Sequence, residues 1–87
     1  MELQLDNSFI RDVKKSPLFV QKEVAVVINV IRTAKNFQEI KNLKKLKGSK
    51  NVYRIKVDQY RVGFYVENGI IILSRCLSRK DIYKYFP

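Results

Sequence analysis

Two short runs in the C-terminal half of the chain alternate between apolar and polar residues, with a period of two that predicts paired β-strands. The runs cover residues 53–57 and 60–66, and Asp58-Gln59 separates them. If these two residues form the loop, Lys56 lies directly opposite Arg61. Like charges that face each other across a sheet are destabilising by up to about 1 kcal/mol. We therefore expect the face that carries Arg54, Lys56 and Arg61 to bind an anion, with phosphate as the first candidate.

The register of the third strand of this sheet is open between two arrangements of Glu67-Asn68-Gly69. A two-residue Asn-Gly turn places Arg75 opposite Val62 on the core face. A three-residue loop places Arg75 opposite Arg61 on the outer face. That loop also turns alternate residues of the strand inward, namely Ile70, Ile72, Ser74 and Cys76. Because burying an unpaired guanidinium is expensive, we favour the three-residue loop, which adds a fourth cation to the outer face.

The N-terminal half of the chain predicts a short strand and two helices. Residues 2–5 form the strand, and Asp6, Asn7 and Ser8 are N-cap candidates for a helix through Lys15. Ser16-Pro17 ends that helix, since proline disfavours helical geometry in the preceding residue. A second helix is expected over residues 18–35. Its apolar stripe has helical spacing and consists of Val20, Val24, Val27, Ile28 and Ile31.

Two further segments complete the chain. Residues 41–50 contain five lysines, which favours a solvated basic loop or helical turn. Residues 78–81 match a capping box, which predicts a short helix through Lys84. The predicted order is β-α-α-β-β-β-α, an α+β fold with a small antiparallel sheet. Two N-terminal helices pack on one face of this sheet, and the other face is exposed and basic.

Length and composition indicate a single domain over residues 1–87, with 46% apolar residues and no membrane-spanning run. No signal segment opens the sequence, so we expect a cytoplasmic protein without membrane contact. Cys76 is the only cysteine, which excludes an internal disulfide, and we interpret it as a small core residue.

The net charge of +10 lies almost wholly in one half of the chain. Residues 1–40 carry six Lys and Arg against five Asp and Glu, whereas residues 41–87 carry twelve against three. Such a concentration of positive charge is typical of a protein that binds nucleic acid or an acidic partner.

The residue inventory excludes most catalytic designs. The chain has no histidine, and it carries neither G-x-x-x-x-G-K-[ST] nor G-x-G-x-x-G, so we expect no metal and no cofactor. Lysine, arginine and tyrosine remain, and these can cleave RNA. A lysine crowded by cations can act as a general base, arginines can stabilise a charged phosphate, and tyrosine can stack on a base. The nucleophile is then the 2′-hydroxyl of RNA itself.

The runs Y-R-I-K-V and Y-R-V, followed by S-R-K-D-I-Y-K-Y-F-P, resemble the RelE/ParE superfamily of toxins from toxin–antitoxin pairs. The resemblance covers essentially the whole chain. RelE-type members enter the ribosomal A site and cut mRNA through 2′-hydroxyl attack. The resemblance therefore implies two partners, mRNA in the ribosomal A site and a cognate antitoxin.

The resemblance also implies roles for individual residues. Lys56 corresponds to the general base, Arg61 to the arginine on the scissile phosphate, and Tyr83 to the tyrosine that stacks on a base. Arg75 completes the catalytic candidates, although Arg79 or Lys80 could equally assist the leaving group. The candidate RNA contacts are Arg54, Arg79, Lys80, Lys45 and Lys47.

Two other functions stay open. Ser78 stands where many relatives have histidine, and ParE-type members share the fold but inhibit DNA gyrase without catalysis. A ParE-like gyrase inhibitor and a basic RNA-binding module without chemistry are therefore the alternatives.

Overall fold

The computed structural model describes residues 1–87, the whole chain. It confirms the α+β class and the predicted order of the main elements. The elements in chain order are β1 (Leu3–Leu5), α1 (Asn7–Lys15), α2 (Leu18–Thr33), the 3₁₀ turn η1 (Phe37–Glu39), β2 (Leu43–Lys45), β3 (Val52–Val57), β4 (Tyr60–Glu67), β5 (Ile70–Ser78) and α3 (Ile82–Tyr85).

The sheet has five strands in the order β1-β5-β4-β3-β2. Strand β1 pairs in parallel with β5, and the other neighbours are antiparallel, so the sheet is mixed at one edge. The strand β2 lies in the lysine-rich segment that we expected to be a loop or helical turn. This expectation was wrong because a three-residue strand has too short a pattern to recognise, and β2 forms by pairing with β3.

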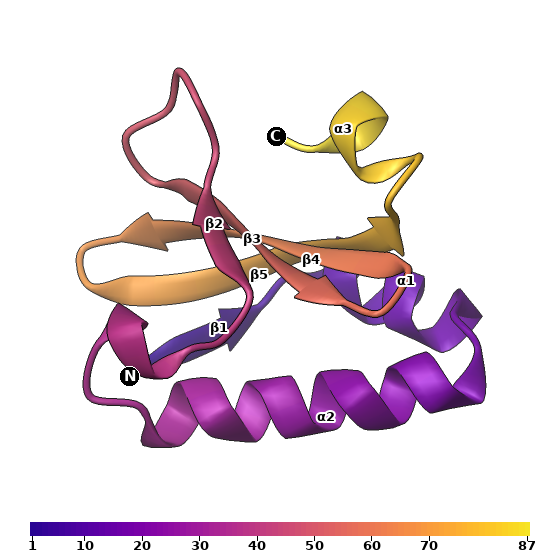
Figure 1. Ribbon diagram of the computed structural model, residues 1–87, viewed down its shortest axis with the longest axis horizontal. Coiled ribbons are helices and arrows are strands. Elements are labelled where there is room, and N and C mark those ends of the chain that lie inside the picture. Colours follow the sequence, from indigo (N-terminus) through magenta and orange to yellow (C-terminus); the bar gives the residue numbers. More distant parts are fainter.

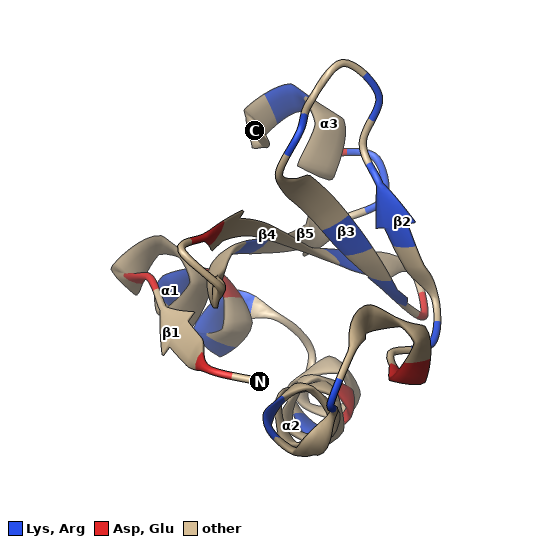
Figure 2. Ribbon diagram, turned by 90° about the vertical axis from the view of Figure 1, so that its left-hand side faces the viewer, with Lys and Arg blue, Asp and Glu red and all other residues tan.

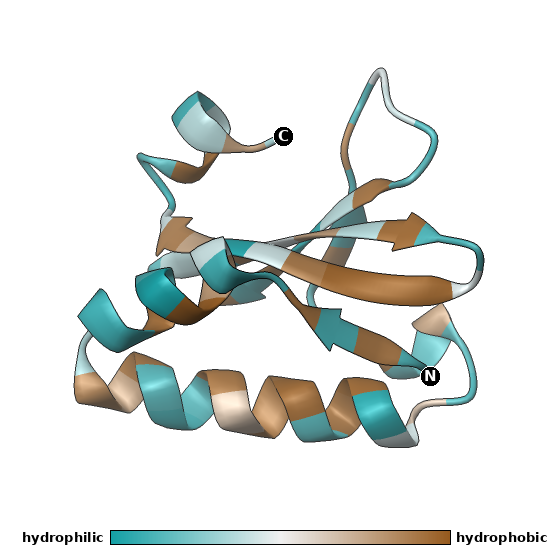
Figure 3. Cartoon of the chain, turned by 180° about the vertical axis from the view of Figure 1, so that it is seen from behind, coloured by the Kyte–Doolittle hydropathy of each residue, from teal (hydrophilic) through white to brown (hydrophobic).

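Helices α1 and α2 lie on one side of the sheet and α3 lies on the other (Figure 1). Figure 2 shows the same layers with α2 seen end-on below the sheet and α3 above it. The predicted stripe of α2 faces the core: Val20, Val24 and Ile31 are buried, and Val27 and Ile28 are partly buried against them. The hydrophobic stretches of α2 and β5 stand out in Figure 3.

The break between the first two helices is confirmed. Helix α1 ends at Lys15 and α2 begins at Leu18, so Ser16-Pro17 lies between them. The buried Ser16 hydroxyl donates a hydrogen bond of 2.6 Å to the Val13 carbonyl, which satisfies an acceptor at the end of α1. None of the helices is long and apolar enough to cross a membrane.

The β3–β4 hairpin has the predicted register, with Asp58-Gln59 as its loop and Lys56 paired with Arg61. The two residues therefore share the outer face, by which we mean the sheet face opposite α1 and α2. The pairing that motivated an anion site on this face is confirmed.

The β4–β5 hairpin differs from the arrangement that we favoured. Its loop has two residues, Asn68 and Gly69, both with positive φ (51° and 77°), and Glu67 pairs with Ile70. This Asn-Gly geometry matches the twist of the strands, which explains why it is preferred. The inward residues next to the loop are consequently Ile71 and Leu73, which are fully buried, and not Ile70, Ile72 and Ser74.

A β-bulge then keeps Arg75 out of the core. The register shifts between Gly63 and Phe64, so that Leu73 pairs with Phe64 but Arg75 pairs with Gly63. Ser74 is the extra residue of the bulge, and beyond it Cys76 points inward as predicted. Arg75 thus avoids burial opposite Val62, but it stands opposite Gly63 and not opposite Arg61.

Candidate functional site

The outer face carries its cations in two neighbouring rows of paired residues. One row contains Lys56 and Arg61. The next row contains Arg54, which pairs with Lys44 of β2 and with Gly63 of β4, and Gly63 pairs in turn with Arg75. Four strands therefore bring their cations to one surface.

Lys56 and Arg61 have no acidic partner. The two ion pairs of the protein join Arg75 to Asp12 and Lys84 to Asp81. Arg61 donates hydrogen bonds of 2.9 Å from one guanidinium nitrogen to the carbonyls of Asp58 and Tyr60, which hold it at the hairpin loop. Lys56 is exposed. The pair presents two positive charges without an acidic partner to an incoming anion, and only the Arg61 side chain is held by hydrogen bonds within the protein.

Arg54 lies beside this pair on β3 and is only partly satisfied. One of its terminal nitrogens donates to the Asn42 carbonyl at 3.1 Å, but its Nε is buried without a partner. A buried donor without an acceptor costs about 1–3 kcal/mol. Such a cost is typical of a functional position.

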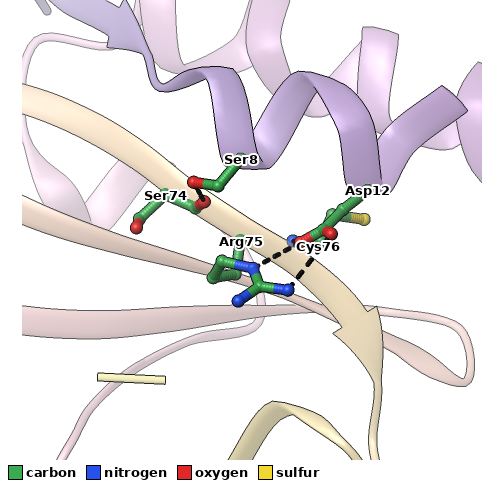
Figure 4. A network of polar contacts seen from close by, with 5 residues as sticks. All are labelled: Ser8, Asp12, Ser74, Arg75 and Cys76. Carbon is green, nitrogen blue, oxygen red and sulfur yellow. Dashed lines mark hydrogen bonds and ion pairs between the residues drawn. The ribbon is translucent and has the colours of Figure 1, made fainter. Parts of the chain in front are cut away.

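Arg75 is held by Asp12 of α1, as Figure 4 shows. Its Nε donates to Asp12 Oδ2 at 2.7 Å and a terminal nitrogen donates to Oδ1 at 3.2 Å. These hydrogen bonds raise the pKa of Arg75 above its ordinary value. The Arg75 guanidinium carbon also lies 5.9 Å from the centre of the Tyr85 ring, on the side of α3. Arg75 is thus a positioned cation and a poor proton donor.

The Asp12 carboxylate also accepts a backbone hydrogen bond at the edge of β5. Asp12 Oδ2 also accepts the Cys76 backbone N–H at 3.0 Å, and one turn earlier Ser8 donates to the Ser74 carbonyl at 2.6 Å. Strand β1 covers β5 only from Ile71 to Leu73, so α1 satisfies the edge beyond it. Asp12 was not among the site residues predicted from the sequence. The available signal was its place four residues after Ser8, on a helix whose neighbouring residues Phe9 and Val13 are apolar.

Helix α3 covers part of the outer face, which corrects our expectation of a fully open surface. Ile82 and Phe86 are buried in a second small cluster with Val52. A Cβ atom at Gly63 would lie 2.5 Å from the Phe86 ring, so only glycine allows this approach. Tyr83 points away from the cluster and is 58% exposed. The basic face is therefore open around Lys56 and Arg61 and covered over Gly63.

The turn before α3 brings Arg79 and Lys80 to the same region. Arg79 N–H donates to the Gln59 carbonyl at 2.8 Å, which fixes this turn beside the β3–β4 loop. Both side chains are exposed. Half of the predicted capping box forms, since the Ser78 hydroxyl accepts the Asp81 N–H at 3.3 Å. A residue 78 of different chemistry would therefore alter the turn that carries both cations.

Comparison with known proteins finds relatives that are similar to this chain in sequence and in fold. No family model matches the chain. It is, however, 36% identical to Toxin RelE3 of Methanocaldococcus jannaschii over an alignment of 88 positions that covers all of both chains.

This chain belongs to the RelE toxin family.

The structural comparisons agree with this assignment. The RelE chain in a crystal structure of a RelB–RelE antitoxin–toxin complex from Methanococcus jannaschii matches with a TM-score of 0.82 and 35% identity, over 97% of this chain and 99% of that one. An archaeal RelE–RelB complex from Pyrococcus horikoshii matches with a TM-score of 0.72 at 16% identity, over 90% and 93% of the chains, and shows the fold alone. The resemblance to the RelE branch is thereby confirmed.

In this RelE-family chain, successive lysine side chains of β2 lie on opposite faces of the sheet. Lys45 pairs with Tyr53, which packs against the core, so it stands on the face opposite the basic rows. Lys44 pairs with Arg54 and stands on the outer face, and Lys47 follows it near α3. Lys44 was not among the residues predicted from the sequence, although the alternation after Leu43 indicates its side once β2 is recognised as a strand.

Cys76 should be chemically inert in the folded protein. Burial, with a smaller contribution from the nearby Asp12 charge, raises the pKa of the Cys76 thiol from 9.0 to about 12. We expect its thiolate fraction at pH 8 to be on the order of 1,000-fold lower than in the unfolded chain. Labelling by a thiol reagent in native buffer and in denaturant measures this difference, and equal rates would contradict it.

The same shift predicts a pH dependence of stability. Because the folded pKa is the higher one, the contribution of the protonated thiol is complete below about pH 9 and is lost as the pH rises toward 12. Cys76→Ala should remove this part of the alkaline loss of stability, and denaturant unfolding of both proteins across this pH range measures it.

Proposed function

We propose that this RelE-family protein is the toxin of a toxin–antitoxin pair and that it inhibits translation by cutting mRNA in the ribosomal A site. The observation that carries the proposal is the pairing of Lys56 with Arg61 on the outer face, without an acidic partner for either. Arg54 and the turn with Arg79 and Lys80 flank this pair. The protein is then an endoribonuclease that acts in the cytoplasm, where ribosomes are.

The residues at the site suit attack by the 2′-hydroxyl of RNA. The Lys56 amine accepts the proton of that hydroxyl, and the oxygen forms a bond to the adjacent phosphorus. Arg61 binds the phosphoryl oxygens and stabilises the charge that develops on them. The bond from phosphorus to the 5′-oxygen breaks, and that oxygen takes a proton from Lys80 while Arg79 stabilises its charge. The products are a cyclic phosphate and a free 5′-hydroxyl.

Arg75 and Tyr83 serve this reaction without exchanging protons. The bidentate contact with Asp12 keeps Arg75 charged, so its contribution is electrostatic. Tyr83 is exposed on α3 and offers its ring to a base. A base that is splayed out of its stack can then hold the phosphate over Lys56.

A cognate antitoxin is the second proposed partner. The structural relatives from Methanococcus jannaschii and Pyrococcus horikoshii were solved as complexes of RelE with RelB. A net charge of +10 favours an acidic partner, both in its rate of association and in its specificity. Such a partner would neutralise the toxin by occupying surface that mRNA or the ribosome needs.

The test is mRNA cleavage by the purified protein, mapped by primer extension, with and without ribosomes stalled with an empty A site. We expect cuts only when such ribosomes are present, and supercoiling by DNA gyrase should be unaffected. Absence of cleavage in both conditions would contradict the enzymatic proposal. Inhibition of gyrase in that case would assign the protein to the ParE-like alternative.

A further inference from the structure

Arg75 contacts elements on both sides of the sheet. Asp12 of α1 holds its guanidinium group, and the ring of Tyr85, at the end of α3, lies 5.9 Å from the guanidinium carbon. Helices α1 and α3 lie on opposite sides of the sheet (Figure 1). We propose that Asp12 is a positioning residue that acts through Arg75 and Tyr85 on the orientation of α3. The inference rests on the proposed function, in which α3 offers the Tyr83 ring to a base.

The edge of β5 is open at Arg75, which allows one side chain to reach both helices. Strand β1 pairs with β5 only as far as Leu73. Beyond that point the Asp12 carboxylate binds Nε and a terminal nitrogen of Arg75, at 2.7 and 3.2 Å (Figure 4). A bidentate contact of this kind fixes the plane of the guanidinium group as well as its position. Tyr85 depends on that position, because a cation–π contact requires the cation over the face of the ring, within about 6 Å of its centre.

Helix α3 needs such a contact because it is a single turn with few anchors on the sheet. Its buried side chains are Ile82 and Phe86, which are four residues apart and therefore lie on the same side of the turn. The ion pair between Lys84 and Asp81 is local to this segment, so it does not tie the turn to the sheet. Two anchors along one line leave rotation of the turn about that line weakly restrained.

Tyr85 supplies the missing restraint. Successive residues of a helix are turned by about 100°, so Tyr85 lies to one side of the line that joins Ile82 to Phe86. Tyr83, two residues before Tyr85, points to a different side and is exposed. A rotation that breaks the contact between Tyr85 and Arg75 therefore also turns the Tyr83 ring. A cation–π contact at an exposed site corresponds to a factor of about two to five in the equilibrium constant between the two orientations.

The first experiment observes position 83 directly and without RNA. The chain has no tryptophan, so Tyr83→Trp introduces a single indole N–H whose NMR resonance can be followed in each background. Asp12→Asn, Arg75→Gln and Tyr85→Leu should each move this resonance along the same line in the two-dimensional spectrum, because each variant shifts the same equilibrium. A resonance that stays in place with Asp12→Asn would overturn the proposal.

The variants are chosen to separate orientation from folding. Asp12→Asn removes the charge that holds Arg75 but keeps an oxygen that can accept the Cys76 N–H. Tyr85→Phe keeps the aromatic ring and should leave the resonance in place. Asp6→Asn removes a carboxylate beside α1 that makes no side-chain capping bond, so it is the matched control. A shift with Asp6→Asn as large as that with Asp12→Asn would contradict the role of Arg75 and Tyr85.

The second experiment measures single-turnover mRNA cleavage on programmed ribosomes. Asp12→Asn and Tyr85→Leu should each slow cleavage about two- to fivefold, and Tyr85→Phe should recover the wild-type rate. The double variant should be no slower than the slower single variant, because both substitutions interrupt the same series of contacts. Effects that multiply in the double variant would overturn the proposal and assign independent roles to the two residues. If the wild type cleaves no RNA, only the proposed function is contradicted, because the NMR experiment decides the role of Asp12 without RNA.

Discussion

Replacing Lys56 by alanine should lower the rate of ribosome-dependent mRNA cleavage by about 100- to 10,000-fold, the range typical for loss of a general base. The side chain is exposed on β3 and makes no ion pair, so folding does not depend on it. The free energy of unfolding should therefore change by less than about 0.5 kcal/mol. Single-turnover cleavage and denaturant unfolding of the same preparation measure the two effects.

Lys56→Arg separates the two roles that a cation can have at this position. Arginine keeps the charge opposite Arg61 but cannot act as a base near neutral pH. If Lys56 is the base, the arginine variant binds RNA as the wild type does and cleaves as slowly as the alanine variant. Restored cleavage in Lys56→Arg would instead limit the residue to binding the phosphate, and full activity of Lys56→Ala would remove it from the mechanism.

Replacing Asp12 by alanine should have the largest effect on stability, about 2–4 kcal/mol. The substitution leaves the Arg75 guanidinium without its partner and removes the acceptor of the Cys76 N–H at the edge of β5. The Asp12 side chain is only 10% exposed, so after the substitution water has little access to hydrogen-bond the groups that Asp12 had bound. For a domain of this size we expect the melting temperature to fall by roughly 10–20 °C.

Two controls identify the cause of this effect. Asp6→Ala removes another carboxylate next to α1, but Asp6 makes no side-chain capping bond, so this variant should lose less than about 0.5 kcal/mol. Combining Asp12→Ala with Arg75→Met should recover part of the stability, because the unpaired charge is gone. A loss in Asp12→Ala no larger than that in Asp6→Ala would contradict the structural role of the ion pair.

The β3–β4 hairpin and the two N-terminal helices could be predicted because their signals are local. The alternation of apolar residues, the short Asp58-Gln59 loop and the break at Ser16-Pro17 act over a few neighbouring positions. The register of that hairpin places Lys56 directly opposite Arg61, so the centre of the candidate site could be proposed from the sequence.

The rest of the site depends on contacts between distant segments. The bulge at Ser74 lets a two-residue Asn-Gly loop coexist with an Arg75 that points outward. Neither of the two registers considered from the sequence, with a two-residue or a three-residue loop, included a bulge. The outward side of Lys44 depends on the pairing of β2 with β3. Asp12 acts on a residue more than sixty positions away, and no local pattern encodes that partner.

The sequence by itself determined the α+β class, the positive charge of the C-terminal half and the pair of cations that face each other across a hairpin. These properties depend on residue type and on spacing within one or two elements. Only the tertiary structure decided that Lys44 joins the predicted cations on the outer face, how much of that face α3 covers through Phe86 on Gly63, and which carboxylate holds Arg75. The physical reason is that these contacts form when the packing of the core fixes the separations of distant segments, which the order of residues along the chain leaves free.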